Sequence, residues 1–197
     1  MTSRLSLSRR RLFPALATVV LLACSSALSA AQLGRIFNSD KNVKYQVFKD
    51  PSGLFELEYP EKDWKRLPSV GQNLVSFSRN DGPTFFVGHV RLSEPFTEAE
   101  IANLPAVELT TLKDQQPKAT GFKSDLFESR AGRGVVIRYS REGTGPETVI
   151  QFSIAVGSEL FRINGVIPDK QVAKYEPIVM YMIQSFKAPA AASPSKH

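Results

Sequence analysis

Apolar and polar residues alternate along several short runs of this chain, and most runs are followed closely by a turn signal. A repeat of two is that of a β-strand with one buried face, and short turns join antiparallel neighbours. Pro51 and Gly53 favour one tight reversal, and segment 80–83 favours another. The pattern therefore predicts an antiparallel sheet. Its expected strands are 45–49, 54–59, 73–79, 84–92, 122–130, 133–141, 147–156 and 159–166.

Two further segments have the repeat of a helix. Thr97 and Glu100 form a capping box, which marks a helix start. Pro105 lacks the amide hydrogen that a helix interior uses, so we expect a second helical piece to begin there and run to about Gln115. Near the C-terminus, with Pro177 expected in the first turn, apolar residues spaced by three and four predict another helix. Its stripe is Tyr175, Ile178, Val179, Met182, Ile183 and Phe186. The order predicts an α+β fold with helices packed on the sheet.

The first 31 residues have the layout of an export signal: a basic segment, an apolar run over 12–23 and a region of small residues. Segment 8–13 also resembles a twin-arginine signal, so both export routes stay open. Residues 21–24 resemble a lipobox, which would make Cys24 a lipid-bearing N-terminus, whereas cleavage after Ala31 would release a soluble form. Downstream we expect a tether over 32–43, one domain over 44–187 and a disordered tail over 188–197.

Positive charge is concentrated in the export signal. The formal net charge is +6, but Arg4, Arg9, Arg10 and Arg11 precede Cys24 and no acidic residue does. Without that segment the chain has 21 basic and 19 acidic residues. The basic isoelectric point therefore does not indicate nucleic-acid binding, and we expect no nucleic-acid partner.

The residues that usually carry catalysis are scarce. One cysteine excludes an intrachain disulfide, and no Gly-x-Ser-x-Gly motif accompanies His89, the one histidine inside the expected domain. We expect His89 to be a half-buried strand residue with a hydrogen bond, not a base or a metal ligand. Glu94, Glu98 and Glu100 are the densest acidic group, which leaves room for at most a weak calcium site. The sequence therefore predicts no catalytic residues, no assigned metal ligands and no cofactor.

Basic residues gather between positions 113 and 141. Arg130, Arg133, Arg138 and Arg141 lie at the turn and along the strand that follows it. Such a cluster can dock an acidic protein or an anionic membrane, although interspersed acids also suit a solvated face. We take these four arginines as the candidate partner-binding residues.

An ordered set of features resembles the PsbP family, whose best-known members are extrinsic subunits of the oxygen-evolving photosystem. The set comprises the entry segment 48–60, Trp64 a few residues later, the mid-chain helix, the hairpin carrying 134–139, and the closing helix with 185–187. The resemblance implies an α/β/α sandwich, with a central antiparallel sheet and helices on both sides. The same fold also serves a Ran-binding nuclear-import factor and mycobacterial lipoproteins.

These observations together favour an exported, non-catalytic binding or assembly module of the cell envelope. Its expected partner is an envelope membrane-protein complex, and in a photosynthetic host photosystem II on the luminal side of the thylakoid. The expected location is the periplasm or, through Cys24, the membrane surface. The alternatives are a periplasmic carrier of a small ligand or calcium-type ion and, third, an envelope hydrolase.

Overall fold

The computed structural model describes residues 43–71 and 73–189, and within them seven strands form one antiparallel sheet in the order β3-β4-β5-β9-β8-β7-β6. The predicted antiparallel sheet is thereby confirmed. Its strands are β3 (Trp64–Leu67), β4 (Asn73–Arg79), β5 (Thr84–Arg91), β6 (Thr120–Ser129), β7 (Gly132–Glu142), β8 (Pro146–Val156) and β9 (Glu159–Pro168). The sequence analysis missed β3, because it is four residues long and only its first residue is buried.

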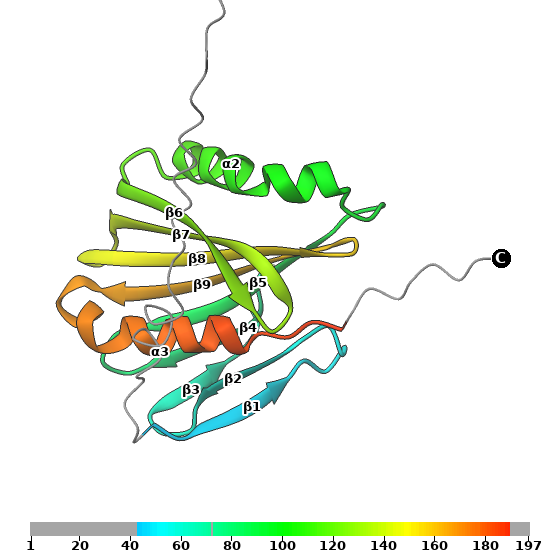
Figure 1. The fold of residues 1–197 in the computed structure, drawn as a ribbon. Coiled ribbons are helices and arrows are strands. Elements are labelled where there is room, and N and C mark those ends of the chain that lie inside the picture. Colours follow the sequence, from blue (N-terminus) through cyan, green and yellow to red (C-terminus); the bar gives the residue numbers. More distant parts are fainter. Residues whose placement is uncertain (1–42, 72, 190–197) are drawn as a thin grey trace, which may run out of the picture.

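A helix packs on each face of the sheet, as the predicted sandwich requires (Figure 1). Helix α3 (Val172–Ser185), which follows the 3₁₀ turn η1 (Asp169–Gln171), lies on one face. The separate hairpin of β1 (Tyr45–Lys49) and β2 (Glu56–Pro60) packs on that same face. Helix α2 (Glu98–Gln115) lies on the opposite face, over the end of the sheet that contains β6 and β7.

Strand β8 supplies core residues to both faces. Ile150, Phe152 and Ile154 point into the larger apolar cluster under α3, whereas the intervening positions point toward α2. Alternation along a strand normally gives one wet face, so a strand buried on both faces needs a helix on each. The two helices therefore follow from the composition of the central strands.

Helix α2 begins as predicted but does not break. The Thr97 side chain accepts from the Glu100 amide, and the Glu100 carboxylate accepts from the Thr97 amide, which confirms the capping box. The expected break at Pro105 is wrong, because the helix is continuous from Glu98 to Gln115. Pro105 leaves the carbonyl of Ile101 without its helical donor, but Ile101 is exposed, so water can replace the missing bond.

Helix α3 confirms the predicted apolar stripe, since Tyr175, Val179, Met182 and Ile183 are buried. Pro177 lies at the sixth helical position, not in the first turn, because the helix begins earlier than expected. Strand β9 approaches α3 closely at Gly165, where any Cβ would overlap the Val179 side chain. The predicted export signal and almost all of the predicted tether and tail lie outside the described residues.

Replacing Gly165 with alanine should therefore lower the free energy of unfolding by about 1–3 kcal/mol, the usual cost of overpacking a filled core. Gly145→Ala is the matched control, because a Cβ there meets no atom within 4 Å. Urea unfolding of both variants measures the difference. Equal stability of the two variants would contradict the close approach of α3 to β9.

Candidate interaction surface

Half of the sheet face that carries α2 is left uncovered by the described residues. Helix α2 packs mainly on β6 and β7, and its apolar cluster does not extend to β5, β4 or β3. On this face Phe86 and Val90 of β5 belong to neither buried cluster, and both are partly exposed. The sheet therefore offers a partner an unoccupied area beside α2.

We call this area the open floor and define it by five residues on three adjacent strands. Register places Ser76 of β4 opposite Phe86 of β5, and Phe86 opposite Asn164 of β9. One row further along, Gly88 stands opposite Arg162. Ser76, Arg162 and Asn164 place polar side chains around Phe86 on this face. Gly88 has no side chain, so the centre of the floor is low.

A buried ion pair holds α2 to the border of the open floor. Glu108 of α2 is 1% exposed, and Arg162 donates to it through Nε at 2.9 Å and Nη2 at 2.6 Å. Ser153 and Gln151 of β8 donate to the same carboxylate at 2.7 and 3.0 Å. A buried carboxylate is tolerated when its oxygens are fully hydrogen-bonded, and this one accepts from three side chains.

The ion pair with Glu108 neutralises the charge of Arg162 and fixes the orientation of its side chain. Burial alone would raise the pKa of Glu108, but the hydrogen bonds from Arg162 and Ser153 and the arginine charge more than offset it, so the pKa lies below 4.5. Glu108 is therefore ionised at neutral pH and neutralises Arg162. The remaining guanidinium nitrogen, Nη1, has no partner among the described residues, and about a third of the side chain faces solvent. Arg162 can thus donate to a ligand without adding net charge to the floor.

The flank of α2 that faces the open floor carries no charge between Glu100 and Asp114. Lys113 lies over the Phe122 ring of β6, so that side of the helix faces β6. Asn103, Val107 and Thr111 occupy the opposite flank, which a helical repeat turns toward β9 and β5. Val107 is 48% exposed there, and a shallow hollow of about 330 Å³ runs along this flank. We call Asn103, Val107 and Thr111 the α2 flank; with the open floor it makes a corner.

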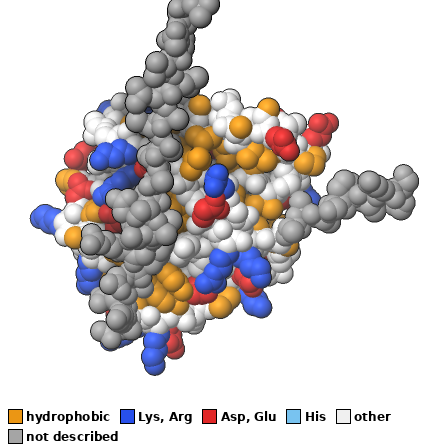
Figure 2. All heavy atoms as spheres, viewed as in Figure 1, with side chains coloured by type: hydrophobic (Ala, Val, Ile, Leu, Met, Phe, Trp, Pro, Cys, Tyr) orange, Lys and Arg blue, Asp and Glu red, His pale blue; other side chains and the backbone are white. Residues whose placement is uncertain are grey.

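The four candidate arginines do not form a free basic patch. Arg130 pairs with Glu58, Arg133 with Glu128, Arg138 with Glu176 and Arg141 with Glu147. The four arginines also do not share one surface. Arg138 pairs with a residue of α3, whereas Arg133 and Arg141 pair with residues of the strands beside β7. On the face in Figure 2, basic and acidic side chains stand beside one another. Partner binding by these arginines stays a prediction.

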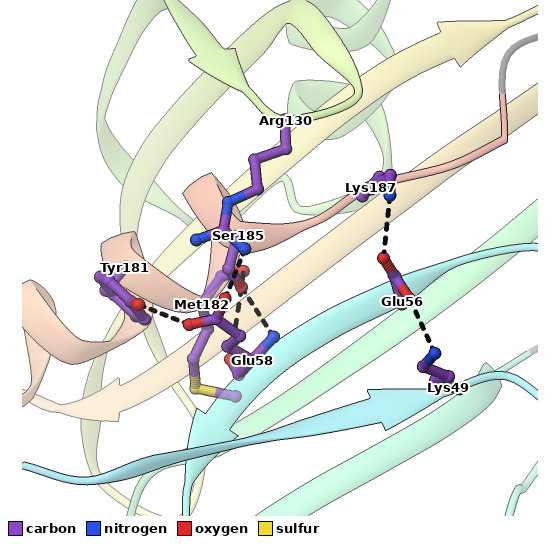
Figure 3. Close-up of polar contacts among 8 residues, drawn as sticks. All are labelled: Lys49, Glu56, Glu58, Arg130, Tyr181, Met182, Ser185 and Lys187. Atoms are coloured by element: carbon purple, nitrogen blue, oxygen red, sulfur yellow. Dashed lines mark hydrogen bonds and ion pairs between the residues drawn. The ribbon is translucent and has the colours of Figure 1, made fainter.

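Arg130 has a structural role at the end of α3 (Figure 3). Its side chain donates to Glu58 of β2, which also accepts from the Tyr181 hydroxyl at 2.5 Å. Partial burial opposes ionisation of Glu58, but the bonds from Tyr181 and Arg130 hold its pKa below the usual range. The Arg130 amide donates to the Gln184 carbonyl. The β6–β7 turn, β2 and the end of α3 are thus joined through one carboxylate.

His89 has the structural role that the sequence predicts. Its Nε2 contacts the carboxylate of Glu159, and its ring lies 5.2 Å from that of Phe161. The weak calcium site that the sequence left open as an alternative gains no support: Glu100 is occupied by the capping box, and the described residues contain no group of three potential metal ligands. No described helix has the length and apolarity to cross a membrane.

An open cavity of about 540 Å³ lies beside the start of β1. Lys44, Lys62, Trp64 and Arg79 line it together with acidic residues. The guanidinium of Arg79 donates to Asp81 at 2.6 Å and thereby lowers the pKa of Asp81 to about 2. Among the charged residues that line this cavity, Arg79 pairs with Asp63 at 3.2 Å.

Sequence reasoning missed Glu108 and Arg162. A signal was present, because Glu108 stands midway between Leu104 and Leu112 on one side of the helix. A charge in such a stripe predicts a buried partner. Arg162 likewise interrupts the apolar run of β9. Only the sheet register shows that the two meet.

Comparison with solved structures identifies the fold of this chain. No family model matches the sequence, and no curated protein is significantly similar to it. The solution structure of cyanobacterial PsbP from Synechocystis superposes with a TM-score of 0.57 at 12% identity, covering 74% of this chain and 93% of that protein. The chain has a PsbP-like fold. This confirms the resemblance inferred from the sequence at the level of fold.

Two other proteins share this architecture. LpqN, involved in cell envelope biogenesis of Mycobacterium tuberculosis, matches with a TM-score of 0.52 at 14% identity, over 81% of this chain and 96% of LpqN. The Ran-binding protein Mog1p of Saccharomyces cerevisiae matches with a TM-score of 0.50 at 10% identity, over 75% of this chain and 97% of Mog1p. The PsbP-like fold therefore occurs in proteins with different roles, and it does not name a partner for this chain.

Glu108→Gln should lower the free energy of unfolding at pH 7 by about 1–3 kcal/mol, less than for a fully buried pair because Arg162 reaches solvent. The stability that comes from a lowered carboxylate pKa is present above pH 4.5 and is lost as the pH falls through the folded-state pKa. The difference in free energy of unfolding between wild type and variant should therefore decrease as the pH falls below 4.5. Chemical denaturation across pH measures it, with Asp114→Asn on the exposed side of α2 as control. A gap that stays constant with pH would contradict the account.

Proposed function

We propose that this chain is an exported, non-catalytic binding module of the cell envelope, which docks a protein partner in the corner between the open floor and α2. The observation that carries the proposal is that corner itself. The corner combines a sheet face, an uncharged stretch of helix and an arginine that is held in place and neutralised. Such a surface is suited to contact with a partner.

The fold supports a binding role. Mog1p, a Ran-binding protein, has the same architecture, and LpqN is involved in cell envelope biogenesis. The one histidine among the described residues is held by Glu159, and we propose no catalytic role for it. Binding thus accounts for the available residues better than turnover does.

The envelope location rests on the N-terminal sequence. Residues 1–31 have the layout of an export signal, and residues 21–24 offer Cys24 for lipidation. A diacylated cysteine would anchor the domain stably, with about twenty residues between the lipid and β1. In a photosynthetic host, the same arrangement would present the corner to photosystem II. Arg130, Arg133, Arg138 and Arg141 are the alternative docking residues.

Intact-mass spectrometry of the protein purified from its own host tests the anchor. We expect a chain that begins at Cys24 and carries added acyl mass. A chain that begins at Gln32 without lipid would replace the anchored form with a soluble exported one. A mass that includes Met1 would overturn cleavage of the export signal and with it both the lipidated and the released form.

Val107→Lys should weaken partner capture at least tenfold, because it places an uncompensated charge on the α2 flank. Ala102→Lys is the matched control, since it adds the same charge to an exposed position on another side of α2. Quantitative co-purification from host membranes compares both with wild type, after thermal melting has shown that both fold. Equal capture by the two variants would reject the corner.

A second candidate function, a small-ligand carrier, is favoured by the 540 Å³ cavity beside Trp64. Native mass spectrometry separates the two. A bound species of a few hundred daltons, lost on Trp64→Ala, would support the carrier. A bound protein would support the docking module.

A further inference from the structure

We infer that the partner of this chain contributes a single α-helix, which lies on the open floor alongside α2 and completes the helical layer of the sandwich. The inference rests on the proposed function and specifies the chemistry of its partner. It follows from the width, charge and shape of the corner.

The width of the uncovered area matches one helix. Helix α2 packs mainly on β6 and β7, and β9, β5 and β4 continue the sheet beyond β8. Strands lie about 4.8 Å apart, so three strands give a floor about 14 Å wide. A helix with its side chains is about 10–12 Å across, and packed helix axes stand about 8–10 Å apart. One helix fits beside α2 over β9, β5 and β4, and only the four-residue edge strand β3 lies beyond it.

The α2 flank allows close approach of another helix. Between Glu100 and Lys113 the one charged residue of α2 is Glu108, and it is buried. A surface helix usually carries charges on its outer side, so the absence of any exposed charge over residues 101–112 is unusual. The hollow along this flank is lined by small and medium side chains, Asn103, Ala106, Val107, Thr110 and Thr111. Ridges of a neighbouring helix pack into such a hollow.

Charge on the open floor selects the kind of helix. Arg162 is neutralised by Glu108, and the other four floor residues, Ser76, Phe86, Gly88 and Asn164, carry no charge. A strongly acidic or basic helix would lose hydration here and gain no opposite charge. Apolar side chains stand at the rim, since Leu67, Leu92 and Val107 are all more than 40% exposed. The fitting partner helix is therefore amphipathic, with apolar contacts at its flanks and an uncharged hydrogen-bond acceptor opposite Nη1 of Arg162.

An extended peptide would use this surface poorly. Partner strands normally add to a sheet edge, where main-chain groups are unpaired, and the open floor offers side chains only. The corner measures on the order of 500 Å², against about 800 Å² per partner in a standard protein interface. This area suits one helix better than a whole globular surface.

Site-specific photocrosslinking in the host tests the inference. The probe p-benzoylphenylalanine replaces Ser76 on the floor and, separately, Val107 and Thr111 on the α2 flank. Val47, which is 56% exposed on the opposite side of the sheet, is the control position. Mass spectrometry then identifies the partner residues joined to each probe. We expect all three probes to reach one partner segment of about 15 residues, at positions three, four or seven apart.

Other outcomes separate this inference from the proposed function. Attachment to one protein at every second residue, or at scattered segments, would overturn the helix and leave the docking module standing. Attachment to a glycan or a lipid would overturn both the helix and the protein partner. Yields no higher than at Val47 would overturn the corner as a binding surface.

Discussion

The ion pair between Glu108 and Arg162 sets the position of α2, and the free surface of this protein depends on that position. The pair joins the middle of the helix to the middle of β9, and Ser153 and Gln151 complete its hydrogen bonds. Apolar packing alone would allow α2 to slide across the sheet, since such contacts are not directional. The Glu108 carboxylate accepts hydrogen bonds from both β8 and β9, and this requirement fixes the position of α2 on the sheet. The helix stays over one half of the sheet, and residues 43–71 and 73–189 leave the other half uncovered.

The two faces of the sheet therefore differ in role. The face under α3 carries the larger apolar cluster and is closed by the β1–β2 hairpin and by the contacts around Glu58. The face under α2 has a smaller cluster at one side and polar residues at the other. Most of the buried core lies on the first face, and the proposed binding corner lies on the second.

Much of the fold was predictable, because strand alternation and turn residues are local signals. The capping box at Thr97 and the stripe of α3 were confirmed for the same reason. The break at Pro105 was predicted wrongly, because the cost of one missing bond depends on whether water reaches the Ile101 carbonyl. That exposure depends on how the helix packs. The proposed binding corner was not predictable from the sequence. The sequence analysis selected the arginines between positions 130 and 141, but folding brings an acidic residue to each of them. Glu108 and Arg162 lie 54 residues apart, and only pairing of β8 with β9 brings their partners together.

Methyl nuclear magnetic resonance of the domain with its purified partner tests the central claim most directly. The claim is that binding occupies the corner between α2 and the open half of the sheet. The account predicts that the methyl signals of Val90 and Val107 shift or broaden on binding, while those of Val47 on β1 and Leu126 on β6, both highly exposed, stay unchanged. Shifts confined to Val47 or Leu126 would contradict it and would place the partner on the hairpin or at the β6 edge.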